Sequence, residues 1–387
     1  MSSPTQTTSA PGSRLAHQVQ ALAHPFSGHA WRSAFTVRRV SGGIAPAVRV
    51  GIAAGLMLVL GGWAGQPQLA GIASLGALAS AFSGSQPLPL RARHLALVGT
   101  ALVLSTGLGA AMGAPGLPLA VQVAVLSLLA GAGALVFSAF TITGPGAVIL
   151  VFAASAGAGF THQSHQPPLV ALAVAAAALG AVVGWLVAMS PALARTPRPD
   201  ERHQVFSEGL ASLRNCGFIH QAIRLAGASA LSGWIAAAAG LDHPLWASMG
   251  AVAALQSLNF ATTVQRSIQR LVGNVLGGLV AAGLILLQLD FWPTVALVVL
   301  FQMAAEILVV RNYILCTLAV TPMALLMTGL GSQLGPNAAL SRMADTLVGV
   351  VLGVLVCAVT VSRTDRHHAR LPAPAGTTLE STTAARA

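Results

Sequence analysis

Glu306 lies deeper in an apolar run than any other carboxylate of this chain, in the stretch Phe301-Gln-Met-Ala-Ala-Glu306-Ile-Leu-Val-Val-Arg311. An ionisable side chain at such depth indicates function if the run crosses a membrane. Arg311 follows five positions later, about 140° around a helix, so these two side chains do not share a face. Glu306 therefore needs another partner, a water-filled cavity or a proton, and the last choice makes it a candidate carrier of a coupling proton. The alternative is structural, with Glu306 reaching the interface or pairing with Arg266 or Arg270.

Three arginines are candidates for recruiting an anion. Arg224, Arg266 and Arg270 are expected at the cytoplasmic ends of neighbouring apolar segments. Arg266 and Arg270 are four residues apart, so they lie on one face of a helix. A guanidinium group matches the geometry of a carboxylate, which suggests an organic acid as the ligand. The competing interpretation is that these arginines only anchor helix ends.

Two Pro-containing breaks occur at corresponding places in the two halves of the chain. Thr143-Gly-Pro145 and Thr321-Pro322 each interrupt an apolar segment. A Pro inside a span frees a backbone carbonyl and kinks the helix. The second apolar segment of each half is also short. Short or broken segments at matching positions are typical of transporter sites and gates, although ordinary kinks give the same pattern.

Other combinations of reactive residues predict no chemistry. His162 and His165 are at most half of a metal site, without a supporting carboxylate. Arg342 and Asp345 are three residues apart on one helical face, which favours a local ion pair near the outer end of the last span. We find no nucleophile with a base at readable spacing, and a chain without lysine cannot form a P-loop. We therefore predict neither an enzyme nor a cofactor or metal.

The composition indicates a membrane protein. Hydrophobic residues make up 55% of the 387 residues and charged residues 7%, which is too little charge for a soluble protein of this size. The net charge of +11 does not predict nucleic-acid binding, because the arginines lie at the ends of apolar segments and the chain has one tyrosine.

The apolar segments predict an all-α protein with about twelve transmembrane helices, six in each half. The first six are expected at residues 46–64, 68–85, 94–113, 117–137, 139–160 and 168–190. The other six are expected at residues 222–240, 244–260, 268–288, 291–309, 312–330 and 339–362. Nearly all arginines that flank these segments fall on one side if both termini are cytoplasmic, and Arg342 is the exception.

The two halves resemble each other, which predicts a duplicated architecture. Gly76 and Gly250 are separated by 174 residues, as are Gly99 and Gly273. An even number of spans in each half makes the repeats parallel, related by an axis along the membrane normal. The chain then divides into a disordered cytoplasmic segment (1–44), a first repeat (45–190), a cytoplasmic linker (191–220) with one short helix (204–214), a second repeat (221–362) and a disordered tail (363–387).

Pairs of glycines four residues apart predict close packing between helices. Such pairs start at Gly180, Gly273 and Gly349. Small residues at this spacing let two helix backbones approach each other, so we interpret them as packing seams and not as sites.

The second half resembles the fusaric acid resistance protein-like family, which is allied to the aromatic acid exporters and more distantly to plant aluminium-activated malate transporters. The resemblance covers residues 221–362 well and 45–190 weakly. It is carried by Leu245-Trp246-Ala-Ser-Met, Arg266-x-x-x-Arg270-Leu-Val-Gly273-Asn-Val-Leu-Gly277, Glu306-Ile-Leu-Val-Val-Arg-Asn312-Tyr313 and Thr321-Pro322.

This resemblance implies a multi-pass inner-membrane protein that exports aromatic or other organic acids, coupled to the proton gradient. It also implies a periplasmic adaptor as a partner where the host has an outer membrane, and a homodimer. Arginines at the cytoplasmic mouth would gather the anion, Glu306 would carry the proton, and Arg311 with the Pro-broken spans would shape the gate. An organic-anion channel and a membrane scaffold that transports nothing remain the alternatives.

Overall fold

The computed structural model describes residues 27–37, 44–83, 87–162, 168–190, 206–241, 243–256, 260–330 and 337–360. These residues form helices joined by turns, and no strand occurs among them. The predicted all-α class is confirmed.

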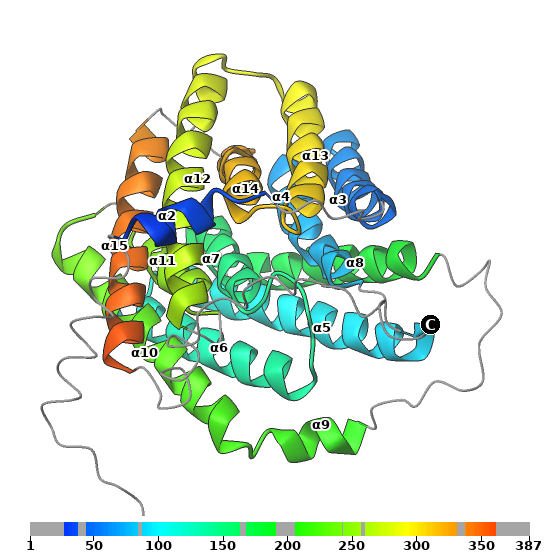
Figure 1. Ribbon diagram of the computed structural model, residues 1–387. Coiled ribbons are helices and arrows are strands. Elements are labelled where there is room, and N and C mark those ends of the chain that lie inside the picture. The colour runs from blue at the N-terminus through cyan, green and yellow to red at the C-terminus, as the bar shows by residue number, and fades with distance from the viewer. Residues whose placement is uncertain are drawn as a thin grey trace, which may run out of the picture.

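Among the described residues, two sets of six helices lie between residues 45 and 189 and between residues 216 and 359 (Figure 1). The first six are α3 (Ala45–Trp63), α4 (Pro67–Ala77) continued by the 3₁₀ helix η2 (Leu78–Phe82), α5 (Leu88–Gly113), α6 (Leu119–Ala139), α7 (Val148–His162) and α8 (Pro168–Met189). The others are α10 (Cys216–Ala238), α11 (Pro244–Leu255), α12 (Phe260–Leu286), α13 (Phe291–Leu308), α14 (Tyr313–Gly329) and α15 (Asn337–Val359). Two short helices, α2 (Gly28–Ala34) and α9 (Phe206–Ser212), lie outside these sets.

Seven helices among the described residues are long and apolar enough to cross a membrane, which makes this a multi-pass membrane protein. They are α3, α5, α6, α8, α12, α13 and α15. Four apolar helices are shorter, and they are the second and fifth of each set: α4 with η2, α7, α11 and α14. The short helices lie towards the centre of the molecule in Figure 1, and α7 contacts both α4 and α11.

The glycine pairs mark close helix contacts, as predicted. A Cβ atom on Gly180 would meet the backbone carbonyl of Ala73, so α8 lies directly against α4. In the same way a Cβ atom on Gly349 would meet the carbonyl of Ala247, so α15 lies directly against α11. The packing interpretation is confirmed for both seams.

The helix pairs that pack in the first set recur in the second. The contacts α3–α4, α4–α8, α5–α7 and α5–α8 have counterparts in α10–α11, α11–α15, α12–α14 and α12–α15. Between the sets, α13 packs on α3 and α6 packs on α10, which again joins the fourth helix of one set to the first helix of the other.

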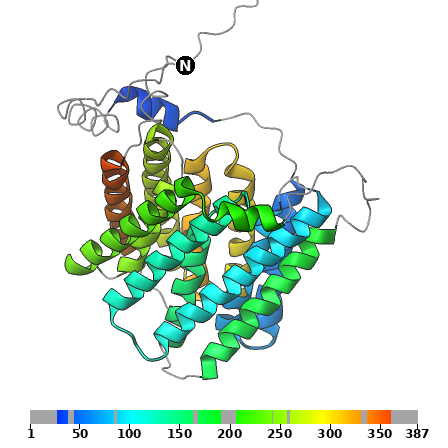
Figure 2. The same ribbon diagram turned by 90° about the horizontal axis from the view of Figure 1, so that it is seen from below.

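The N-terminal segment differs from the expectation of disorder. Residues 27–37 form α2 and a short extension that pack on α12, where Ala30 and Ala34 contact Val264 and Ile268. Helix α2 crosses in front of α12 in Figure 1 and lies at the edge of the molecule in Figure 2, and the two helices are in contact. The expectation failed here because the contacts are made with a helix more than 200 residues away in sequence, which local composition does not reveal. Residues 1–26, 38–43 and the tail 363–387 lie outside the described residues.

Three helix boundaries also differ from the predictions. Helix α7 begins at Val148 and not at residue 139, because Gly144 and Gly146 have positive φ angles of 156° and 79° and Pro145 stands between them. Helix α12 begins at Phe260 and not at residue 268, because its first turns carry polar side chains that an apolar window excludes. Helix α10 begins at Cys216, inside the expected linker, because Asn215 caps it. The short linker helix is present as α9.

Candidate functional site

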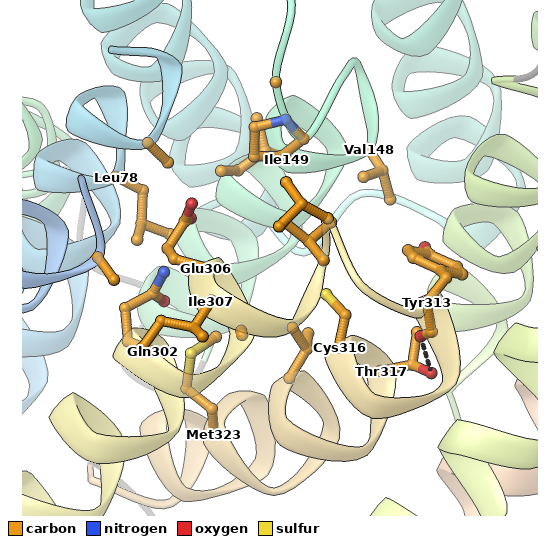
Figure 3. A pocket seen from close by; sticks show the side chains of 18 of the residues that line it. Leu78, Val148, Ile149, Gln302, Glu306, Ile307, Tyr313, Cys316, Thr317 and Met323 are labelled. Atoms are coloured by element: carbon orange, nitrogen blue, oxygen red, sulfur yellow. Dashed lines mark hydrogen bonds between the residues drawn. The ribbon is translucent and has the colours of Figure 1, made fainter. Parts of the chain in front are cut away.

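A cavity of about 730 Å³ lies between the two sets of helices (Figure 3). Its walls come from the starts of α3 and α5, from η2, from α7 and the segment before it, and from α11, α12, α13, α14 and α15. Most of the lining is apolar. The charged groups that line it are Arg49, Arg91, Arg266, Arg270, Arg311, Arg342 and Glu306.

Glu306 faces this cavity from the last turns of α13. Its side chain projects towards Leu78 of η2, and Gln302 lies one turn earlier on the same helix (Figure 3). No hydrogen bond or ion pair joins Glu306 to another described residue. The sequence allowed Glu306 a charged partner, a cavity or a proton, and the structure places its side chain at the cavity.

Tyr313 organises the two α12 arginines that line the cavity. The guanidinium carbon of Arg266 lies 4.8 Å from the centre of the Tyr313 ring, a cation–π contact. The Nη1 atom of Arg270 donates a hydrogen bond to the Tyr313 hydroxyl at 3.3 Å. Cys316, one turn further along α14, lies within electrostatic reach of Arg266, Arg270 and Glu306. The phenol of Tyr313 thus contacts both of the arginines that α12 contributes to the cavity.

The predicted site residues do not all meet. Glu306, Arg266, Arg270 and Arg311 line one cavity, and Arg311 is exposed at its edge. Arg224, on α10, is outside the lining. The structure therefore does not bring Arg224 into the cavity with the α12 arginines, and α10 packs instead against α6, α11 and α15.

The two Pro-containing breaks are not equivalent in the structure. Thr143 and Pro145 line the cavity, but they belong to the non-helical segment before α7. Pro322 lies inside α14 and does not line the cavity. Thr321 is buried, and two acceptors lie within reach of its hydroxyl proton, Asn274 Oδ1 at 3.1 Å and the Thr317 carbonyl at 2.8 Å. The prediction of matching breaks inside two helices is wrong, because positive φ angles at Gly144 and Gly146 end helical structure ahead of α7.

Sequence reasoning missed Arg342 as a residue of this site. Its side chain lines the cavity with a relative exposure of 6%, and its guanidinium carbon lies 4.8 Å from the Trp246 ring centre. Asn274, near the middle of α12, donates a hydrogen bond to the Arg342 carbonyl at 3.3 Å. Arg342 therefore lies in the first turns of α15, as expected, and its backbone is beside the middle of α12. The Arg342–Asp345 spacing described the local neighbour correctly, since Asp345 acts electrostatically on Arg342, but it could not reveal the cavity.

Arg49 and Arg91 also line the cavity, although the sequence marked them only as signals of orientation. Tyr313 was noticed only as part of the family resemblance. These three side chains face the cavity because of how α3, α5 and α14 pack, and no local sequence pattern predicts that packing. Among the described residues, no group of three or more His, Cys, Asp or Glu side chains gathers as metal ligands would, and His165 lies outside that part of the chain.

The fold and the cavity define a multi-pass membrane protein with a charged internal cavity. A family model described as fusaric acid resistance protein-like matches residues 230–356, which confirms the predicted resemblance for that stretch. The match includes all of α11 to α14 and most of α15.

One curated relative is an uncharacterized membrane protein, YvaC, of Bacillus subtilis (strain 168). It is 32% identical over 120 residues, which is 31% of this chain and 18% of the relative. The chain thus matches less than a fifth of that relative's length. No solved structure matches the chain.

Proposed function

We propose that this protein transports organic anions, and that it exports aromatic or other organic acids across the inner membrane. The observation that carries the proposal is the cavity, in which Glu306 and six arginines face one space among apolar walls. Guanidinium groups pair with carboxylates, and apolar walls suit the hydrocarbon body of an organic acid. A volume of about 730 Å³ is within the range of small-molecule sites in proteins.

Proton coupling through Glu306 is part of this proposal. A carboxyl group on a membrane helix that faces a cavity can exchange a proton with the water inside it. The cations on the opposite wall, Arg266 and Arg270, attract the substrate carboxylate to the same space. Binding of the anion and protonation of Glu306 both change the net charge of the cavity. The two events are therefore linked.

Alternating access between two related halves is the mechanism that we propose. The recurrence of α3–α4, α4–α8 and α5–α7 contacts in the second half supports two parallel repeats of six helices. In this arrangement twelve helices cross the membrane, the short second and fifth helices of each half reach the cavity, and both termini are cytoplasmic. The segment with Thr143 and Pro145, which lines the cavity without helical structure, is the proposed gate.

The test is efflux of a panel of aromatic and aliphatic acids from cells with and without this protein. The proton gradient is left intact or is collapsed while the membrane voltage is clamped. Export that stops when the gradient collapses supports the proposal. Flux that follows the voltage and ignores the gradient identifies an anion channel, and no difference for any acid contradicts transport of this substrate class.

A further inference from the structure

Arg270 and Arg342 approach the same end of the cavity from two different helices. Arg270 belongs to α12 and Arg342 to α15, and these two helices pack directly on each other. The two guanidinium groups are close enough to repel each other electrostatically. Like charges that are held together away from water are costly unless an anion lies between them.

An aromatic side chain contacts each of the two guanidinium groups. Tyr313 accepts a hydrogen bond from Arg270 Nη1, and Trp246 lies against the guanidinium of Arg342. The Trp246 ring is itself stacked on His243, with ring centres 4.5 Å apart and an interplanar angle of 13°. Rigid aromatic supports of this kind prevent either arginine from turning away to the solvent.

The side-chain amide of Asn274 sets the spacing between the two arginines. Asn274 follows Arg270 by one helical turn, so both side chains leave the same face of α12. Its Nδ2 atom donates to the Arg342 carbonyl, and its Oδ1 atom accepts from the Thr321 hydroxyl. This amide ties α15 and α14 to α12 at the level of the two guanidinium groups.

Both arginines keep unused donor groups. The Nε atoms of Arg270 and Arg342 are buried and have no hydrogen-bond partner among the described residues. Arg342 is more than nine-tenths buried and lines the cavity. A buried donor that is left unpaired is costly, whereas an oxyanion accepts from such donors. Asp345, which is fully buried on α15, offsets one of the two charges, so with Asp345 ionised the three side chains carry one net positive charge.

We propose that Arg270 and Arg342 form an oxyanion subsite that holds the single carboxylate of the transported acid at the inner end of the cavity. The subsite deepens the proposed function and rests on it for the identity of the ligand. The hydrocarbon body of the acid then lies along the apolar wall that includes Ile149, Phe152 and Met323.

The experiment measures binding of benzoate to the purified full-length protein in phosphatidylcholine nanodiscs by calorimetry. We expect R342Q and R270Q each to weaken binding by about tenfold or more, the loss typical of a hydrogen bond to a charged group. R342K should recover part of the affinity because it keeps the charge and loses the planar fork. R214Q is the matched control, because Arg214 is exposed near the start of α10, and its affinity should equal that of the unchanged protein. Equal benzoate affinity in all four variants would overturn the subsite.

Two further measurements separate the explanations. Thermal unfolding of each variant without benzoate reports folding, and because R270Q and R342Q alter different helices, a folding defect in one leaves the other informative. Nanodiscs that contain phosphatidylglycerol test whether a lipid headgroup occupies the subsite. Unchanged benzoate affinity supports the organic acid as occupant, and competition by the lipid overturns it. If the unchanged protein binds benzoate but transports no acid, the proposed function is refuted and the subsite is not. If R270Q and R342Q bind and transport benzoate as the unchanged protein does, the subsite is refuted and the proposed function is not.

Discussion

Tyr313 is the side chain on which the two α12 arginines of the cavity depend. Its ring lies under Arg266, and its hydroxyl accepts from Arg270. The two contacts use different parts of the phenol, so two substitutions can separate them. Among the described residues, the side-chain contacts of these two arginines are both made with Tyr313.

Substitution of Tyr313 tests this arrangement. Y313F keeps the ring under Arg266 and removes the acceptor of Arg270, so we expect the apparent KM for an exported acid to rise by about fivefold, the effect of one ordinary hydrogen bond. Y313A also removes the cation–π contact and should raise KM further. Both values come from uptake into inside-out vesicles. Equal KM values for Y313F and Y313A would contradict a role for the ring.

Glu306 allows a test of coupling that is independent of binding. E306Q keeps the size of the side chain and removes its ability to exchange a proton. We expect transport driven by a proton gradient to stop in E306Q, while exchange of labelled for unlabelled acid across the membrane continues. The measurement compares net and exchange fluxes in proteoliposomes at matched protein levels. Normal gradient-driven transport by E306Q would rule out Glu306 as the proton carrier.

The residues that the sequence found and those that it missed differ in a physical respect. Glu306 stands out because a charge inside an apolar run is locally improbable, and Arg266 and Arg270 stand out because their four-residue spacing puts two cations on one helix face. Arg342 is buried, but a local ion pair with the nearby Asp345 was enough to explain a charge at that position. Its position in the cavity depends on the packing of α15 on α12, which no local pattern encodes.

Two glycine seams hold the short helices against their long neighbours. Gly180 brings α8 onto α4, and Gly349 brings α15 onto α11. In both seams the would-be Cβ meets a backbone carbonyl, which cannot move aside as the end of a flexible side chain can. The short helices α4 and α11 are thus kept in place by contacts that tolerate no added side chain.

Valine at these glycines should separate the helices. We expect G180V and G349V each to destabilise the folded protein by about 1–3 kcal/mol, the usual cost of overpacking, and to lower the thermal unfolding midpoint. The matched control is G159V on α7, where a Cβ meets nothing within 4 Å. G159V should unfold at the same temperature as the unchanged protein. An equal midpoint for all three variants would contradict the seam interpretation.

Asn312 connects the N-terminal segment to the cavity. Its Nδ2 atom donates to the carbonyls of Ala34 and Thr36, while its Oδ1 atom caps α14 by accepting from the Ile314 amide. Arg311 and Tyr313, on either side of Asn312, both line the cavity. Through this one amide, residues 27–37 can influence the cavity although they do not line it.

Loss of the Asn312 amide should therefore release α2. We expect N312A to increase hydrogen exchange across residues 28–37 and at the start of α14, measured by mass spectrometry. N215A is the matched control, since Asn215 caps α10 by accepting from the Gly217 amide. N215A should increase exchange at the start of α10 and leave α2 unchanged. If α2 exchanges equally in both variants, Asn312 does not retain it.

The positions of the helices were largely predictable, because each is an apolar run bounded by polar or Pro-containing turns. The boundaries failed where tertiary contacts replaced local signals. The first turns of α12 remain helical because Gln265 and Gln269 donate to the carbonyls of Ser33 and Ala34. On composition alone, the span was predicted to start after these polar turns. On the same basis, residues 27–37, which contact these turns, were predicted to be disordered.

At the scale of the whole molecule, the packing of the two helix sets bears on orientation. Cys216 begins α10, and α2 packs near the beginning of α12. If α10, α11 and α12 each cross the membrane once, the beginnings of α10 and α12 lie on the same side. Cys216 and the N-terminal segment are then on the same side, which the distribution of arginines predicts to be the cytoplasmic one.

The three native cysteines make this orientation measurable without new labels. Cys216 is exposed, whereas Cys316 and Cys357 are buried. A membrane-impermeant maleimide should therefore label the protein in inside-out vesicles and leave it unlabelled in right-side-out vesicles, with C216S as the unlabelled control. Labelling of Cys216 only in right-side-out vesicles would invert the orientation and place the edge of the cavity at Arg311 outside the cytoplasm. In that case the arginines of the cavity would gather their anion from the outer side, and import would replace export as the direction of transport.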